Sequence, residues 1–155
     1  MAVDLQQQAL HVTLNAAHMA KDLFLKAAAD ERLDLTFPQL AVLLSLPETP
    51  ILIKDCGGRA GIDRSTVSAI VWRLSVRGLV TIRNEANGRI TRACLISITE
   101  KGARLRQHGE NILSRLDKAY LEEVGDAGAQ ALLMRQLAQI IEHHTAQRGD
   151  ASLEQ

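Results

Sequence analysis

Residues 51–92 read ILIKDCGGRAGIDRSTVSAIVWRLSVRGLVTIRNEANGRITR, and this stretch decides the fold. It predicts two helices, over about 51–59 and over 64–77, joined by a tight turn. Asp63 is a typical N-cap residue for the second helix. Gly78 supplies the left-handed residue that often follows the last turn of a helix. The stretch therefore begins with a helix-turn-helix.

The hydrophobic period changes after the second helix. Apolar residues then alternate with polar ones, which is typical of strands that bury one face. Val80 and Ile82 share a face of the first expected strand, and Cys94, Ile96 and Ile98 share a face of the second. The pair Asn87-Gly88 between them is a hairpin-turn signal. A helix-turn-helix followed by a hairpin with a basic tip is a winged helix-turn-helix.

The second helix has two different faces. Its apolar residues predict an inward stripe of Val67, Ile70, Val71 and Leu74. The outward face then holds Arg64, Ser65, Thr66, Ser68, Ala69, Trp72 and Arg73. Small polar side chains near a helix N-terminus fit a DNA major groove, and the helix dipole attracts phosphate. Gly57 is expected where the two helices cross, because only a small residue allows close approach there.

The charge of the chain is unevenly distributed. Eighteen basic and eighteen acidic side chains cancel overall, but residues 51–92 hold eight basic and three acidic ones. Seven of those eight are arginines, whose planar guanidinium donates paired hydrogen bonds to phosphates and base edges. This pattern indicates a localised site for a polyanion. A solvated charged surface is the alternative interpretation.

Long helices are expected on both sides of this segment. Apolar or small residues spaced four and three apart form a seam at Leu5, Ala9, Val12, Ala16, Met19 and Leu23, which predicts a helix of about 25 residues. A second apolar stripe on it fits either association with a second subunit or an ordinary core helix. Thr36 and Gln39 form a capping box for the next helix. Gly125-Asp126-Ala127-Gly128 separates two helices near the end of the chain.

These elements, in this order, resemble the MarR family of bacterial regulators. The resemblance rests on residues 35–43, 60–68, 77–80 and 95–102. It implies a mainly α fold with a small β-hairpin wing, a winged helix-turn-helix within an intertwined helical dimer. The expected parts are an N-terminal dimerisation helix (1–35), the winged helix-turn-helix (36–99), C-terminal dimerisation helices (100–148) and a frayed tail (149–155).

The resemblance also implies where double-stranded DNA binds. Each protomer of a homodimer would insert its second motif helix into a major groove and its wing into a minor groove, on an inverted-repeat operator. The wing arginine of the family matches Arg92, although Ile90 stands where the family has aspartate, and Arg89 is a rival. The expected DNA contacts are Arg64, Ser65, Thr66, Ser68, Ala69, Arg73, Arg89 and Arg92.

A small-molecule effector is a further implication of the resemblance. Members of the family often bind aromatic acids, phenolics or related compounds between the dimer helices and the winged domain. The residues on the corresponding elements are His11, His18, Phe24, Arg32 and Phe37. The expected function is a ligand-responsive repressor that such an effector releases from its operator.

Three alternatives remain. A thiol-based redox sensor would use Cys56 or Cys94, whose positions fit core residues better. A winged-helix module that binds protein would suit the neutral net charge. An enzyme is not expected, because the sequence has no nucleophile elbow, phosphate-binding glycine loop or HExxH motif. No cofactor or metal site is expected either, since His143 and His144 are adjacent and point in different directions.

The sequence also bears on the compartment. It has no apolar run long enough to span a bilayer and no signal-peptide pattern at its start. Its two cysteines do not suggest a disulfide framework. We therefore expect a cytoplasmic protein without a membrane partner.

Overall fold

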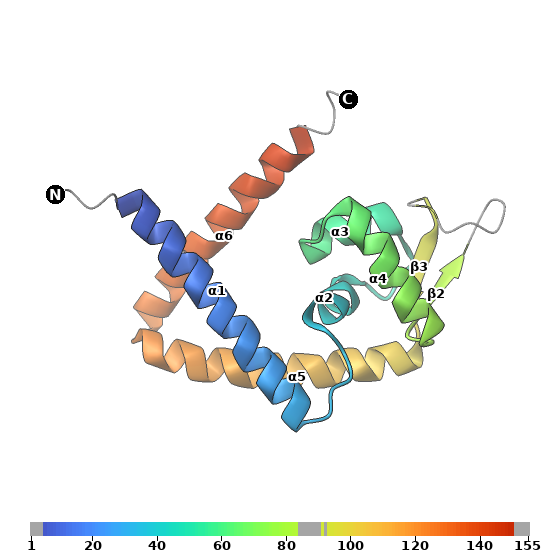
Figure 1. The fold of residues 1–155 in the computed structure, drawn as a ribbon, viewed down its shortest axis with the longest axis horizontal. Helices are drawn as coiled ribbons and strands as arrows, with labels where there is room; N and C mark the ends of the chain where they lie inside the picture. Colours follow the sequence, from blue (N-terminus) through green and yellow to red (C-terminus); the bar gives the residue numbers. More distant parts are fainter. Residues whose placement is uncertain (1–4, 84–90, 92, 151–155) are drawn as a thin grey trace. The chain divides into compact units, whose positions relative to one another are not determined.

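A computed structural model describes residues 5–83, 91 and 93–150, with side chains from residue 11 to residue 142 except that of residue 64. The elements are α1 (Leu5–Asp30), α2 (Phe37–Ser45), β1 (Ile51–Leu52), α3 (Ile53–Ala60), α4 (Arg64–Val76), β2 (Val80–Arg83), β3 (Leu95–Ile98), α5 (Glu100–Val124) and α6 (Ala127–Asp150) (Figure 1). They confirm a mainly α fold with a small antiparallel sheet. Among the described residues, no helix is both long and apolar enough to cross a bilayer.

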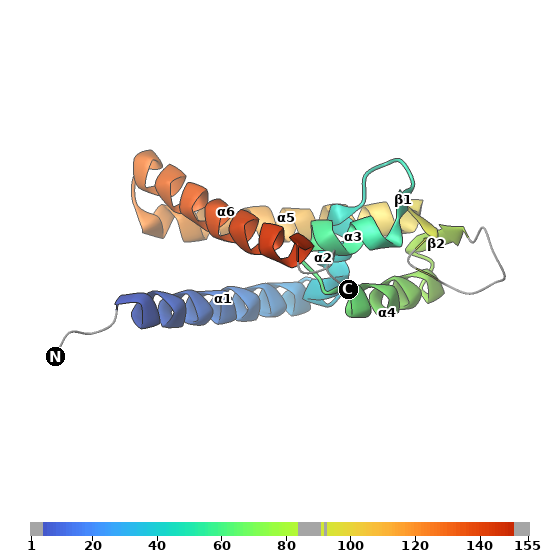
Figure 2. The same cartoon turned by 90° about the horizontal axis from the view of Figure 1, so that it is seen from above.

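The chain divides into two compact units, Met1–Leu113 and Ser114–Gln155, and the boundary falls inside α5. In the first unit, α2 packs against both α3 and α4, and α4 packs against β2 (Figure 2). In the second, the Asp126 carboxylate accepts a hydrogen bond from the Ala129 N–H at 2.9 Å and caps α6. The helix break predicted at this point is confirmed. α6 continues to Asp150, past the predicted end at residue 148.

The sheet has three strands where the sequence predicts two, in the order β1-β3-β2. Ile51 pairs with Ile96 and Leu52 with Leu95 on one edge of β3, while Val80 to Arg83 of β2 pair along the other edge. The prediction of a helix from about Ile51 is therefore wrong at its start, because β3 supplies backbone partners for these two residues. α3 begins only at Ile53, whose N–H donates to the Cys94 carbonyl at 3.0 Å.

The start of β3 also differs from the prediction. Cys94 is expected on the strand, but β3 begins one residue later, at Leu95. The Cys94 N–H donates to the Thr91 carbonyl at 3.0 Å, which closes a turn instead of extending the ladder. The Cys94 side chain still points into the core, where it is 3% exposed.

The core of the winged domain forms from the faces that periodicity predicts. Val67, Ile70, Val71 and Leu74 of α4 are all buried, which confirms the inward stripe. The other buried apolar residues of this core come from α2, α3, the sheet and the residue before β2, namely Leu40, Val42, Leu43, Ile53, Cys56, Leu79, Val80 and Ile96. A methyl group on Gly57 would lie 3.3 Å from the Val67 side chain and from the Ile62 carbonyl oxygen. This close approach confirms the role predicted for Gly57.

Two glycines let α5 lie directly against the winged domain. A Cβ on Gly102 would lie 2.0 Å from the backbone oxygen of Leu79. A Cβ on Gly109, two turns further along α5, would lie 2.4 Å from a methyl group of the buried Leu40. Thr99 caps α5, because its hydroxyl accepts the Gly102 N–H at 3.0 Å.

Outside this core, the long helices carry exposed apolar residues. On α1, Phe24 and Ala28 are buried. The exposed apolar side chains of α1 are Val12, Leu14, Met19, Leu23 and Leu25, and those of α6 are Leu132, Met134, Leu137, Ile140 and Ile141. Both α1 and α6 thus carry apolar side chains that are exposed to solvent.

Candidate nucleic-acid interface

The turn between α3 and α4 sets how α4, the second helix of the motif, projects from the domain. Gly61 has a φ of 64°, the left-handed conformation that glycine adopts without strain. The Ile62 N–H donates to the Gly57 carbonyl at 3.0 Å. Asp63 then occupies the N-cap position of α4, as predicted. The helix-turn-helix is thereby fixed by backbone contacts within a few residues.

The outward face of α4 carries most of the described candidates for DNA contact. Ser65, Thr66, Ala69 and Arg73 are exposed, and Ser68 is half-buried. The backbone of residue 64 belongs to α4, but its side chain is not among those described. Arg89 and Arg92, the two wing candidates, also lie outside the described residues. The five described candidates therefore lie together on one helix.

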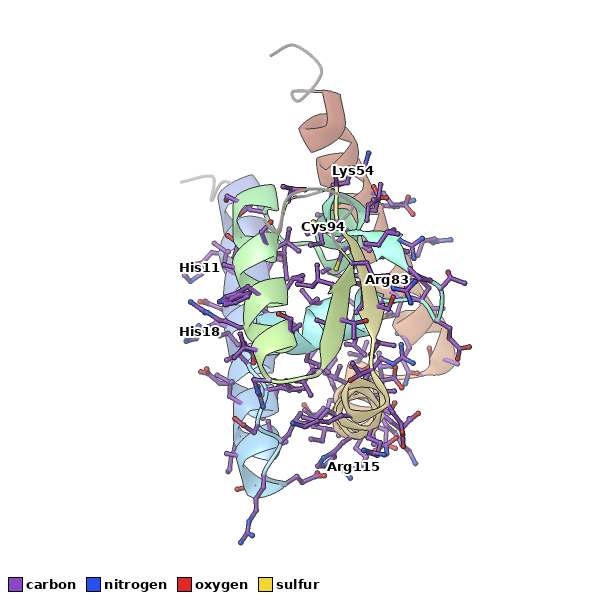
Figure 3. All side chains as sticks on the ribbon, turned by 90° about the vertical axis from the view of Figure 1, so that its right-hand side faces the viewer. His11, His18, Lys54, Arg83, Cys94 and Arg115 are labelled. Atoms are coloured by element: carbon purple, nitrogen blue, oxygen red, sulfur yellow. The ribbon has the colours of Figure 1, made fainter. Side chains whose placement is uncertain are left out.

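Other exposed cations lie near this helix. Lys54 and Arg59 are exposed on α3, and Arg83 is exposed at the end of β2. Figure 3 shows Lys54 and Arg83 projecting away from the core of the winged domain. These three cations belong to the basic segment 51–92, but they are not among the DNA contacts expected from the sequence. Their positions on the motif helix and the wing strand make them candidates for phosphate contacts.

Arg77, in contrast, is turned back toward its own chain. Its guanidinium donates to the Asp34 carboxylate at 2.8 Å and to the Gln39 side chain at 3.4 Å. Its carbonyl accepts a hydrogen bond from the Lys101 ammonium at 2.9 Å. Arg77 thus ties the end of α4 to the α1–α2 connection and to the start of α5. The number of cations in the sequence does not distinguish an arginine that pairs within its own chain from one that faces DNA.

The five residues expected to bind an effector are spread along α1, the connection that follows it and the start of α2. Phe24 is 1% exposed and packs edge-to-face against the 41% exposed Phe37, with ring centroids 5.4 Å apart. Arg32 is exposed beyond the end of α1 and has a φ of 56°. Of the five, Phe24 and Phe37 are in direct contact.

His11 and His18 lie further along α1. Both are exposed, and Figure 3 shows them on the same side of α1. His11 is hydrogen-bonded to Asn15 at 3.0 Å, and His18 lies 3.5 Å from the Asp22 carboxylate. A helix rises about 1.5 Å per residue, so His18 is about 9 Å and His11 about 20 Å along the axis from Phe24. The two histidines thus belong to a different part of α1 from the aromatic pair.

Solved structures share the fold of this protein over almost the whole chain. PcaV from Streptomyces coelicolor, a transcriptional regulator in complex with its natural ligand, is 27% identical, covers 92% of this chain and 97% of its own, and has a TM-score of 0.76. A MarR-family regulator from Rhodococcus sp. RHA1 is 20% identical over 93% and 96%, with a TM-score of 0.71. The chain has the winged helix-turn-helix fold of MarR-type transcriptional regulators. The predicted resemblance to the MarR family is confirmed at the level of the fold.

A third solved structure extends the comparison. CouR from Rhodococcus jostii RHA1, bound to p-coumaroyl-CoA, is 23% identical, covers 90% of this chain and 95% of its own, and has a TM-score of 0.72. Comparisons of the sequence with protein-family models and with curated proteins give no match. The likeness is therefore carried by structure more than by sequence.

Both cysteines are free thiols buried in the winged domain. Burial raises the pKa of the Cys56 thiol, although the Ser45 hydroxyl at 3.3 Å and the charge of Arg59 act in the opposite direction. A raised pKa lowers the thiolate fraction, and thiolate is the reactive form. Cys94 accepts a hydrogen bond from the Thr91 N–H at 3.1 Å. This environment fits a core thiol better than a redox sensor.

Arg77→Ala tests the tie between α4 and the α1–α2 connection. We expect the free energy of unfolding to fall by about 1 kcal/mol, because the Asp34 carboxylate is exposed and the pair is well solvated. DNA affinity should fall several-fold at every salt concentration, with an unchanged slope of log affinity against log salt, since Arg77 contacts no phosphate. Arg73→Ala, the matched comparison, should lower that slope by about one for each protomer. A reduced slope in the Arg77 variant would place this guanidinium on DNA.

Proposed function

We propose that this regulator is a homodimeric repressor that binds an inverted-repeat operator and is released by a small aromatic or acyl effector. The observation that supports it most directly is the outward face of α4. There, small polar side chains and Arg73 are exposed, while the opposite face of the same helix is buried. Small side chains let a helix enter the major groove, and arginine then contacts phosphates or base edges. In this proposal Arg64, Arg89 and Arg92 contribute further contacts.

The dimer is supported by the apolar surfaces of α1 and α6. Met19 is 64% exposed on α1, and Ile141 is 65% exposed on α6. Large exposed apolar patches mark interaction surfaces, and these two occur on the helices that the sequence assigns to dimerisation. A two-fold dimer would present two copies of α4 to half-sites about one turn of DNA apart.

The effector is proposed from the aromatic pair and from the known relatives. Phe24 and Phe37 join α1 to α2, and Phe37 leaves part of its ring accessible. PcaV binds a natural ligand and CouR binds p-coumaroyl-CoA. We infer that an aromatic acid or acyl thioester binds near Phe37, with Phe24 as the buried support of that ring. His11, His18 and Arg32 are proposed contacts of lower priority, because they lie away from the pair.

A gel-retardation titration tests DNA binding. With duplex selected by the protein from a random pool, raising NaCl from 50 to 200 mM should lower the affinity about 1,000-fold, because a dimer with at least six phosphate contacts releases as many counterions. Arg73→Ala should weaken binding. Arg104→Ala is the matched control, since Arg104 is exposed on α5 and paired with Glu100; it should bind like the parent.

The same titration separates the alternatives. Absence of retardation even at 50 mM NaCl would contradict the proposal and favour a module that binds protein. Adding aromatic acids or acyl thioesters to the preformed complex should release the duplex.

A further inference from the structure

The outermost line of α4 combines small and apolar residues. Helical residues turn by about 100° each, so the residues directly opposite the buried stripe are Ser65, Ala69, Trp72 and Val76. The exposures agree, because Trp72 is 55% exposed and Val76 is 67% exposed. Trp72 therefore does not lie at the side of the domain. It stands at the crest of the helix face that is proposed to enter DNA.

Exposing the indole of Trp72 to water costs free energy unless another molecule covers it. An indole carries a large apolar surface, and its N–H normally finds an acceptor when it is buried. In the part of the chain that the structure describes, the indole of Trp72 forms no hydrogen bond or ring contact. The Ser75 hydroxyl donates to the backbone carbonyl of Trp72 at 2.8 Å, and this hydrogen bond does not involve the indole. The side chain is thus free to meet something outside the protomer.

The surroundings of Trp72 select between two partners. Thr66 and Arg73 are exposed beside this line, and Ser65 lies on it, so the apolar pair of Trp72 and Val76 continues a polar and cationic face. Trp72 and Arg73 would also suit a protein interface, but the other exposed cations of the motif and wing, Lys54, Arg59 and Arg83, favour a polyanion. A major groove presents acceptors, donors and phosphates, together with one apolar group, the C5-methyl of thymine. This is the combination that the face of α4 matches.

We propose that Trp72, with Ala69 and Val76, recognises thymine methyl groups in the major groove and is a specificity-determining residue of this regulator. The inference rests on the proposed DNA-binding function and deepens it. Polar contacts from Ser65, Thr66 and Arg73 would position the helix, while the apolar crest favours half-sites with thymine at the facing positions. Replacing thymine by uracil removes only the methyl group and leaves the charge and hydrogen-bonding groups of the duplex intact.

The experiment uses the full-length protein and a duplex selected by it from a random pool, made once with dT and once with dU. The parent should bind the dU duplex about fourfold more weakly for each contacted methyl, which corresponds to the transfer of one such group. Trp72→Gln should bind the dT duplex more weakly and lose the difference between dT and dU. Trp72→Phe should keep part of the difference. The salt dependence should be the same in all three, because no phosphate contact changes.

A second measurement follows Trp72 directly, because it is the single tryptophan of the chain. Its fluorescence should change on titration with duplex and become protected from acrylamide. Retardation without any fluorescence change, or equal dT and dU affinities for the parent, would overturn this inference and leave the proposed function standing. Complete absence of retardation would overturn both. A change of fluorescence with protein concentration alone would identify a protein interface and also overturn it.

Discussion

Replacing Gly102 by alanine is expected to lower the free energy of unfolding by about 3 kcal/mol or more. The added methyl group would lie 2.0 Å from the Leu79 backbone oxygen and 3.0 Å from the Ile98 side chain. A flexible side chain could move away, but this oxygen cannot. Leu79 is buried, its carbonyl accepts the Thr99 N–H at 3.1 Å, and its own N–H donates to Leu74 at 2.9 Å. The start of α5 would have to withdraw from the sheet.

Urea denaturation of the purified variants measures this effect. Gly58→Ala is the matched control, because Gly58 is exposed inside α3 and an added methyl group would meet nothing within 4 Å. Alanine is favoured over glycine in a helix, so this variant should gain up to about 1 kcal/mol. If Gly102→Ala proved as stable as the parent, the close approach of α5 to Leu79 would be wrong.

The second large effect is expected at the junction of α1 and α2. Phe24→Ala should lower the free energy of unfolding by about 3–5 kcal/mol, because a fully buried phenyl ring is replaced by a cavity. Phe24 is 1% exposed and its ring meets Phe37 edge-to-face. The loss includes the apolar transfer of the ring and an aromatic contact of about 1 kcal/mol. Thermal unfolding and urea unfolding should rank the stabilities of the parent and the variant in the same order.

Phe37→Ala provides the comparison for Phe24. Phe37 is 41% exposed, so its removal should cost much less, about 1–2 kcal/mol. Comparing the two variants separates the structural role proposed for Phe24 from the ligand contact proposed for Phe37. A Phe37 variant that folds normally but no longer responds to an effector would agree with the proposal. Equal destabilisation by the two substitutions would contradict the difference in burial.

The features that sequence predicted well are those with local causes. The capping box of Thr36 and Gln39 forms through two hydrogen bonds between residues three apart. The left-handed Gly78 has a φ of 69° directly after the last turn of α4. Such features depend on a few neighbouring residues, and residue type alone largely decides them. The same holds for the inward stripe of α4, which follows from helical periodicity.

The features that sequence missed depend on distant partners. β1 is two residues long, and it is a strand only because it pairs with β3; no local pattern in Ile51-Leu52 distinguishes it from a helix start. Arg77 is a cation like its neighbours in the sequence, and only the fold brings it to Asp34. For the candidate site, periodicity placed the outward residues of α4. It gave no reason for Trp72, because the sequence cannot show what an exposed indole faces.

The contacts at the end of α4 have a consequence for how a signal could travel. The Thr99 hydroxyl donates to the Gly78 carbonyl at 2.8 Å, and the Lys101 ammonium donates to the carbonyl of Arg77. Gly102 adds a backbone-to-backbone approach beside them. Because these contacts hold the two elements together, we expect the first turns of α5 and the last turn of α4 to move as one rigid body. A few degrees of rotation in α5 would therefore turn α4 with it, and in the proposed dimer this would alter the separation of the two copies of α4 without unfolding either element.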